Sequence, residues 1–274
     1  MKNAKQLQLL EILAHGKTII SSILSKFISE KNKKVLLIDF DIFNSNINTI
    51  FGVKKYAKNT QKIDTKNDEK NGQKNNNIIN KKYTNFENNF GKNLREKNDN
   101  FFTINDEKIN INNYIFSINK NLNILLGIDE MLEAREKEEL LKIKKILNIL
   151  KKEYDFIIID TSSRLEFKYV KLVLSSAEKI IFLIEPNVLE IQKSKNMLDV
   201  FIRDWNIEID KIKIVFNKTN MYQIAESILE EIYYDFEVLG KIEYEQKYNL
   251  FINKNTKCFL ENKEYENIYQ KMNV

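Results

Sequence analysis

Apolar and polar positions along this chain follow two alternating periods, which predict strands and helices in turn. Short, uninterrupted apolar runs occur at 35–38 and 156–159, and such runs are typical of strands covered on both faces. Apolar residues at helical spacing follow Thr18 and recur over 135–152. The same patterns predict further strands at 121–126, 180–184, 212–216 and 236–242, and further helices at 44–51, 165–176, 188–202 and 221–234.

Strands that alternate with helices predict an α/β fold with a mostly parallel sheet and helices on both faces. Ligands of such sheets bind outside the carboxyl ends of the strands. Polar residues that directly follow predicted strands are therefore the first candidates for a functional site.

One segment departs from the alternation. Residues 54–113 contain 17 Asn in 60 residues, few aliphatic side chains and no sustained period. Such a stretch buries too little apolar surface to offset its ordering entropy. We therefore predict a mostly disordered insertion inside a single domain that spans residues 1–274. The remaining 214 residues (274 minus 60) have a normal size for one α/β domain.

The basic excess of the chain lies in that insertion. Residues 54–100 hold 12 basic and 6 acidic residues, so the net charge of this segment is +6. The whole chain has a net charge of +5, so the rest of the chain has a net charge of −1. Aromatic residues lie between these lysines, which keeps a nucleic-acid tether open as a hypothesis. A solvated loop is the interpretation that we favour.

Scarce residue types exclude several classes of site. His15 is the single histidine, which excludes His-rich zinc sites. Cys258 is the single cysteine, which excludes a disulfide framework and fits a reducing compartment, so we expect a cytoplasmic protein. The sequence shows no apolar run of the roughly 20 residues that a membrane-spanning helix needs. The six glycines are far apart, which excludes a GxGxxG loop.

A phosphate site is indicated at the start of the first predicted helix. Gly16, Lys17 and Thr18 form the tripeptide that ends a P-loop, in which the lysine reaches phosphates and the hydroxyl binds Mg²⁺. Asp41 follows the next predicted strand, and Asp160 ends the most apolar one. A carboxylate in that place can hold the metal through water.

With these residues in order, the sequence resembles the MinD/ParA family of P-loop ATPases, which carries a deviant Walker A motif (SIMIBI class). The resemblance covers about residues 16–255 outside the insertion, and the segments that carry it are 16–18, 34–41, 154–161, 185–187, 215–218 and 238–242. It implies ATP and Mg²⁺ as ligands. It also implies a role for each matched residue: Gly16 and Lys17 at the phosphates, Thr18 and Asp160 at the metal, Asp41 orienting the attacking water, and Asn217 at the adenine.

The glycine-rich part of the P-loop is missing. In the pattern G-x-x-x-x-G-K-[ST], the positions that should hold glycines or the family's extra lysine hold Glu11, Ile12, Leu13 and Ala14. Two explanations remain open: a degenerate member that no longer hydrolyses ATP, or an altered start of the chain, for example through a frameshift. Residues 6–13 supply either the strand that precedes the loop or a helix.

We therefore expect a cytoplasmic ATP-binding protein that controls the positioning or assembly of a partner, as a homodimer with a further protein. Whether it hydrolyses ATP stays open. The alternative is a non-catalytic localisation or scaffold protein of the same fold, similar to the pilus- and secretion-associated CpaE/TadZ branch. Residues 265–272 have the spacing of an amphipathic helix, but nearby glutamates argue against membrane targeting.

Overall fold

A computed structural model describes residues 8–13, 16–41, 46–53, 101–104, 107–110, 115–125, 137–162, 164–166, 168–221, 224–244 and 263–272. The chain divides into two units, one formed by Met1–Lys54 with Tyr114–Val274 and the other by Lys55–Asn113. The residues of the predicted site all belong to the first unit.

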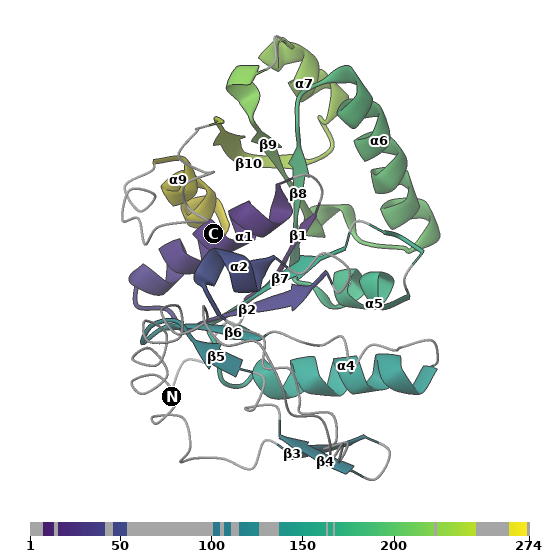
Figure 1. Ribbon diagram of the computed structural model, residues 1–274. Coiled ribbons are helices and arrows are strands. Elements are labelled where there is room, and N and C mark those ends of the chain that lie inside the picture. Colours follow the sequence, from purple (N-terminus) through teal and green to yellow (C-terminus); the bar gives the residue numbers. More distant parts are fainter. Residues whose placement is uncertain are drawn as a thin grey trace, which may run out of the picture. The chain divides into compact units, whose positions relative to one another are not determined.

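An eight-stranded sheet forms the centre of the first unit (Figure 1). Its strand order is β10-β9-β8-β1-β7-β2-β6-β5, and every neighbouring pair is parallel except β5–β6. The strands are β1 (Gln8–Leu13), β2 (Val35–Phe40), β5 (Ile115–Ser117), β6 (Leu122–Leu125), β7 (Phe156–Thr161), β8 (Lys179–Ile184), β9 (Ile212–Asn217) and β10 (Glu237–Ile242).

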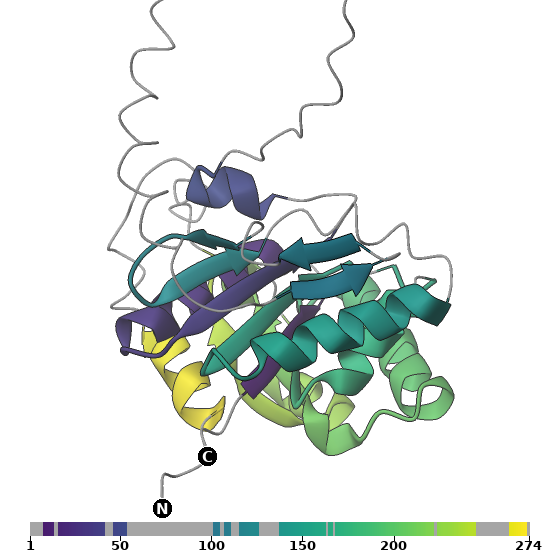
Figure 2. The same cartoon turned by 90° about the horizontal axis from the view of Figure 1, so that it is seen from below.

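Helices cover both faces of this sheet (Figures 1 and 2). Helices α1 and α9 lie on one side, whereas α4, α5 and α6 lie on the other. The helices are α1 (Lys17–Glu30), α2 (Ile47–Phe51), α4 (Lys137–Leu150), α5 (Lys168–Ser176), α6 (Val188–Asp199), α7 (Glu226–Ile232) and α9 (Lys263–Met272). The predicted α/β fold is confirmed.

The continuous apolar runs explain this two-sided cover. In β2, Val35 and Leu37 belong to the core cluster that includes α1 and α9. Their neighbours Leu36 and Ile38 point to the opposite face and are also fully buried. A strand without polar alternation is stable only between two layers of helices, and that is where β2 lies.

Two predictions about element bounds need correction. Residues 8–13 form strand β1, so the alternative of a helix over residues 6–13 is wrong for the described part of that segment. Pairing with β7 on one side and β8 on the other holds β1 extended at the centre of the sheet. The helix predicted at 221–234 begins at Glu226, because residues 219–221 form a separate 3₁₀ turn.

The second unit contains a β-hairpin, made of β3 (Phe101–Ile104) and β4 (Glu107–Asn110). Residues 101–104 and 107–110 thus form regular structure within an insertion that the composition predicts to be mostly disordered. Residues 54–100 and 111–113 lie outside the described residues. Their disorder, and the nucleic-acid hypothesis for the insertion, stay predictions.

The amphipathic C-terminal helix uses its apolar face inside the protein. Tyr265, Ile268, Tyr269 and Met272 of α9 are buried, and the ring of Tyr269 lies 6.0 Å from that of Phe27 on α1. This face is therefore occupied by the protein's own core. Among the described helices, none is both long and apolar enough to cross a membrane.

Candidate functional site

The strand order brings the predicted site residues to one edge of the sheet. Strand β1 lies between β7 and β8, and β2 lies next to β7. Asp41 directly follows β2, Asp160 lies near the end of β7, and three residues separate the end of β1 from the start of α1. Because these strands are parallel, their carboxyl ends meet around the start of α1.

The start of α1 has the properties of an anion site. Gly16 precedes the helix with φ +84°, in the left-handed region that favours glycine. As the N-cap residue, Gly16 has no side chain to cap this helix end, and the first turn of α1 contains no acidic residue. The first N–H groups of a helix have no intrahelical partner and favour negative charge. Lys17 and Thr18 add an ammonium and a hydroxyl group to that end.

Lys17 forms an ion pair with Asp41. Its Nζ lies 3.0 Å from Oδ2 of Asp41, and the two side chains are only 15% and 5% exposed. The backbone N–H of Asp41 donates a hydrogen bond of 3.2 Å to Oδ1 of Asp39. The pair is thus held in a largely buried position, where water screens its charges little.

Asp160 lies beside this pair and is almost completely buried, at 1% exposure. Burial raises the pKa of Asp160 from its ordinary value of 3.8 to about 7. The charge of Lys17 and the nearby Thr18 side chain lower this pKa, while the charges of Asp39 and Asp41 raise it. Thr18 lies close enough to act on the pKa, but no hydrogen bond of good geometry reaches either oxygen of Asp160.

These features fit a phosphate ligand with a divalent cation. Buried carboxylate oxygens without hydrogen-bond partners, as in Asp160, are costly unless a cation or a bound water satisfies them. Within the described part of the chain, no group of three His, Cys, Asp or Glu residues has the arrangement of a metal site. Mg²⁺ is usually held by one or two carboxylates, several waters and substrate phosphates, so the residues present fit it.

Asn217 ends β9 on the other side of the same site. A Cβ atom placed on Gly16 would lie 2.8 Å from Nδ2 of Asn217, so the amide lies directly over the backbone that precedes α1. The structure therefore brings all six predicted residues together, Asn217 against Gly16 and the others around Lys17.

The sequence did not predict the ion pair beside Asn217. Lys218 has φ +57° and places its Nζ 2.5 Å from Oε1 of Glu185, which is buried at the end of β8. The sequence signalled only that both residues follow predicted strands. The left-handed backbone of Lys218 turns the chain immediately after Asn217.

The profile of a family described as "AAA domain" matches residues 14–207, which is most of the chain. The chain belongs to this AAA-domain family. No curated protein sequence matches it.

Solved structures with the same fold are ParA- and MinD-type proteins. One is a plasmid partition protein from Borrelia burgdorferi bound to AMPPNP, with 21% identity, a TM-score of 0.62 and coverage of 97% of this chain and 98% of that one. MinD from Pyrococcus horikoshii complexed with Mg-ADP has 16% identity, a TM-score of 0.62 and coverage of 97% and 96%. The MinC:MinD complex of Aquifex aeolicus has 17% identity, a TM-score of 0.60 and coverage of 97% of this chain and 96% of that one. The resemblance to MinD/ParA-type P-loop ATPases is confirmed.

This AAA-domain protein differs from the P-loop pattern in how β1 ends. Ile12 pairs with Asp160 of β7, and Leu13 pairs with Phe182 of β8. In the pattern G-x-x-x-x-G-K-[ST], positions 12 and 13 belong to the loop that wraps phosphates. Here these two positions take part in the sheet ladder. Three residues, 14–16, connect β1 to α1.

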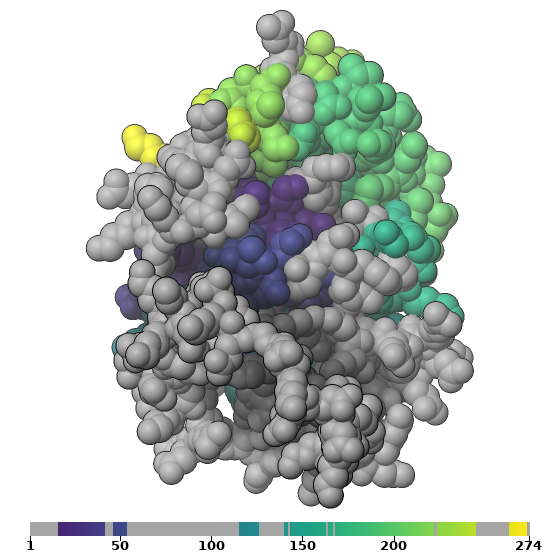
Figure 3. All heavy atoms as spheres, in the orientation of Figure 1, coloured from purple at the N-terminus to yellow at the C-terminus, as the bar shows by residue number. Residues whose placement is uncertain are grey.

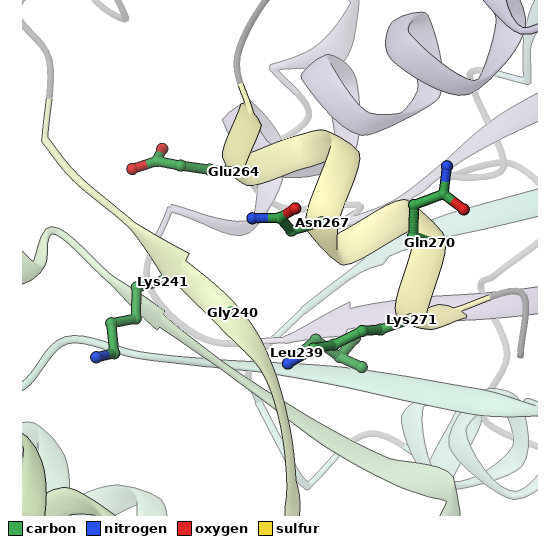
Figure 4. Close-up of a pocket in the computed structure, with 7 residues that line it drawn as sticks. All are labelled: Leu239, Gly240, Lys241, Glu264, Asn267, Gln270 and Lys271. Atoms are coloured by element: carbon green, nitrogen blue, oxygen red, sulfur yellow. The ribbon is translucent and has the colours of Figure 1, made fainter.

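A groove elsewhere on the AAA-domain protein is separate from this site. It has a volume of about 430 Å³ and lies between β10 and α9 (Figure 4). Its lining comprises Leu239, Gly240, Lys241, Glu264, Asn267, Gln270 and Lys271. None of the predicted site residues belongs to it.

In Figure 3, atoms of α1 and α2 reach the surface near the middle of the face shown.

Proposed function

We propose that this AAA-domain protein binds ATP with Mg²⁺ at the start of α1 and uses the bound nucleotide to control the positioning or assembly of a protein partner. The observation that carries the proposal is the arrangement of Lys17, Asp41 and Asp160 around an uncapped helix N-terminus. Asp160 contributes buried oxygens that have no hydrogen-bond partner in the described part of the chain, as expected of a residue that faces a cation.

Each residue has a role that its position supports. The ammonium group of Lys17 and the first N–H groups of α1 would bind phosphate oxygens. The Thr18 hydroxyl and the Asp160 carboxylate would hold Mg²⁺, either directly or through water. When bound, the metal ion neutralises phosphate charge.

Asn217 and Asp41 would act on the adenine base and on the attacking water. Asn217 offers an amide that can donate to and accept from a purine, on the side of Gly16 that faces β9. Asp41 would orient the attacking water after Lys17 has moved from its carboxylate to the phosphates. Hydrolysis is the part of the proposal that depends most on this rearrangement.

A protein partner and a second copy of the chain complete the proposal. The MinD structure of Aquifex aeolicus is a complex with MinC, which shows that a protein of this fold assembles with a partner.

For the present chain, the single cysteine of the sequence supports a reducing compartment, and we propose the cytoplasm.

Titration with Mg-ATP tests nucleotide binding directly. We expect micromolar to submillimolar binding by the wild-type protein and a loss of at least tenfold in Lys17→Ala. Lys33→Ala, which changes an exposed lysine after α1, is the control and should bind like wild type. Equal and negligible binding by all three proteins would exclude the nucleotide function. Release of phosphate from ATP, measured in parallel, tests hydrolysis.

A second candidate function is a non-catalytic scaffold, similar to the CpaE/TadZ branch. The observation in its favour is the sheet pairing of Ile12 and Leu13, which removes two positions from the phosphate loop. This candidate predicts no phosphate release above background and a partner interaction of equal affinity with and without Mg-ATP. The proposed ATPase predicts that Mg-ATP changes that affinity.

A further inference from the structure

The ion pair between Lys17 and Asp41 has a consequence for nucleotide affinity. We propose that Asp41 competes with nucleotide phosphate for Lys17, so that it holds the lysine in the nucleotide-free protein and lowers the apparent affinity of the site. This inference rests on the proposed nucleotide-binding function. Asp41 would act on Lys17 in the nucleotide-free protein, before it acts on the attacking water.

The competition follows from the geometry of a single ammonium group. Lys17 Nζ lies 3.0 Å from Oδ2 of Asp41, which is the distance of a direct charged hydrogen bond. To contact a phosphate oxygen at a similar distance, the same ammonium group has to leave this carboxylate. Asp41 is almost fully buried, and its Oδ1 has no hydrogen-bond partner among the residues that the structure describes. When the lysine turns to a phosphate, this carboxylate loses its counter-ion in a place where water replaces it poorly.

Neighbouring charges increase this cost. Asp39 and Asp41 both raise the pKa of Asp160 through their charges, and Lys17 lowers it. Lys17, Asp39 and Asp41 therefore all lie within electrostatic reach of Asp160, and Lys17 is in direct contact with Asp41. Moving that lysine to a phosphate leaves several carboxylates close to a further anion, unless a divalent cation enters with the nucleotide.

The short connection between β1 and α1 makes the lysine more important in this chain. Since positions 12 and 13 pair within the sheet, fewer backbone N–H groups are free to wrap a phosphate than in the complete loop pattern. Lys17 then supplies a larger share of the attraction for the nucleotide. When a binding-competent state is populated only in part, the apparent dissociation constant rises in inverse proportion to that population.

The experiment compares the binding of the non-hydrolysable analogue AMPPNP with Mg²⁺ to wild type, Asp41→Asn and Glu185→Gln. Asparagine keeps the shape of the side chain and removes the charge that holds Lys17, so we expect about tenfold tighter binding. Glu185 is the matched control, because it is also buried and ion-paired but to Lys218. Its variant should bind within threefold of wild type.

Two binding results would overturn the inference while leaving the proposed function intact. One is wild-type binding that Asp41→Asn leaves unchanged or weakens. The other is an equal gain from Asp41→Asn in a Lys17→Met background, because simple repulsion of phosphate would then explain it. A double-mutant cycle of the same two positions in urea unfolding, without nucleotide, should show that they are coupled, and additivity would also refute the pair. If no variant binds AMPPNP, the proposed function itself fails, and the inference fails with it.

Discussion

Substitution of Gly16 by alanine isolates the most constrained point of the site. Gly16 has φ +84°, and an alanine forced into the left-handed region costs about 1–2 kcal/mol. The new Cβ atom would also lie 2.8 Å from Nδ2 of Asn217, closer than real Cβ contacts, so the buried amide must move. Overpacking of this kind costs about 1–3 kcal/mol. We therefore expect Gly16→Ala to lower the free energy of unfolding by about 2–5 kcal/mol.

A second glycine of the same protein separates these two costs. Gly52 ends α2 with φ +67°, but a Cβ atom there would have no heavy atom within 4 Å. Gly52→Ala should lose only the backbone contribution, about 1 kcal/mol. Urea unfolding followed by far-UV circular dichroism measures both variants, and Mg-ATP titration should show a loss of binding in Gly16→Ala alone.

The difference in unfolding free energy between the two alanine variants tests the close approach of Gly16 to Asn217. Asn217→Ala should reduce the excess cost of Gly16→Ala, because the crowded amide is then absent. Equal destabilisation by Gly16→Ala and Gly52→Ala, within 0.5 kcal/mol, would show that the backbone before α1 does not approach Asn217 as described.

Three further predictions concern buried charge, a backbone clasp and the C-terminal helix. Because the folded pKa of Asp160, about 7, exceeds its unfolded value, the folded state keeps a proton that the unfolded chain loses, so stability should fall as pH rises from 4 to 7. Asp160→Asn should remove that slope in urea unfolding and stabilise the protein above pH 7, by at most about 4 kcal/mol; an unchanged slope contradicts the assignment. The Asn220 side chain accepts from the N–H of Tyr244 and donates to its carbonyl, so Asn220→Ala should cost about 1 kcal/mol and speed hydrogen exchange at the Tyr244 amide, and unaltered exchange would contradict the clasp. Ile268→Ala, which empties a buried position of α9, should cost about 2–4 kcal/mol in thermal unfolding, whereas a loss below 1 kcal/mol would mean that α9 does not pack on the sheet.

The regular elements of the sheet were predictable because each of their positions carries the same signal. The run Phe156–Ile159 is apolar throughout, and only a strand covered on both faces buries all of it. The helix that starts at Lys17 has its apolar residues on one side, and they pack into the core cluster as predicted. In such segments local propensity and tertiary packing favour the same structure.

The β1 strand and the hairpin of the second unit were not predictable in the same way. Residues 8–13 have the apolar content of either a helix or a strand, and pairing with β7 and β8 decides between them. The hairpin of β3 and β4 lies in a segment whose average composition predicts disorder, and only β3 has the apolar and β-branched residues typical of a strand. Pairing between distant or neighbouring strands is a tertiary property that a single local window does not contain.

The candidate site shows how far sequence order alone leads to chemistry. Lys17, Asp41 and Asp160 are 24 to 143 positions apart along the chain, yet each follows or ends a strand, and parallel strands place such residues at one edge. The sequence therefore predicts which residues meet. It does not predict which of them pair, because pairing depends on distances of a few ångströms. Asp41 was expected at the attacking water, and that role stays a prediction; the structure adds its ion pair with Lys17, which the sequence did not indicate. Any phosphate ligand of this site must compete with that contact.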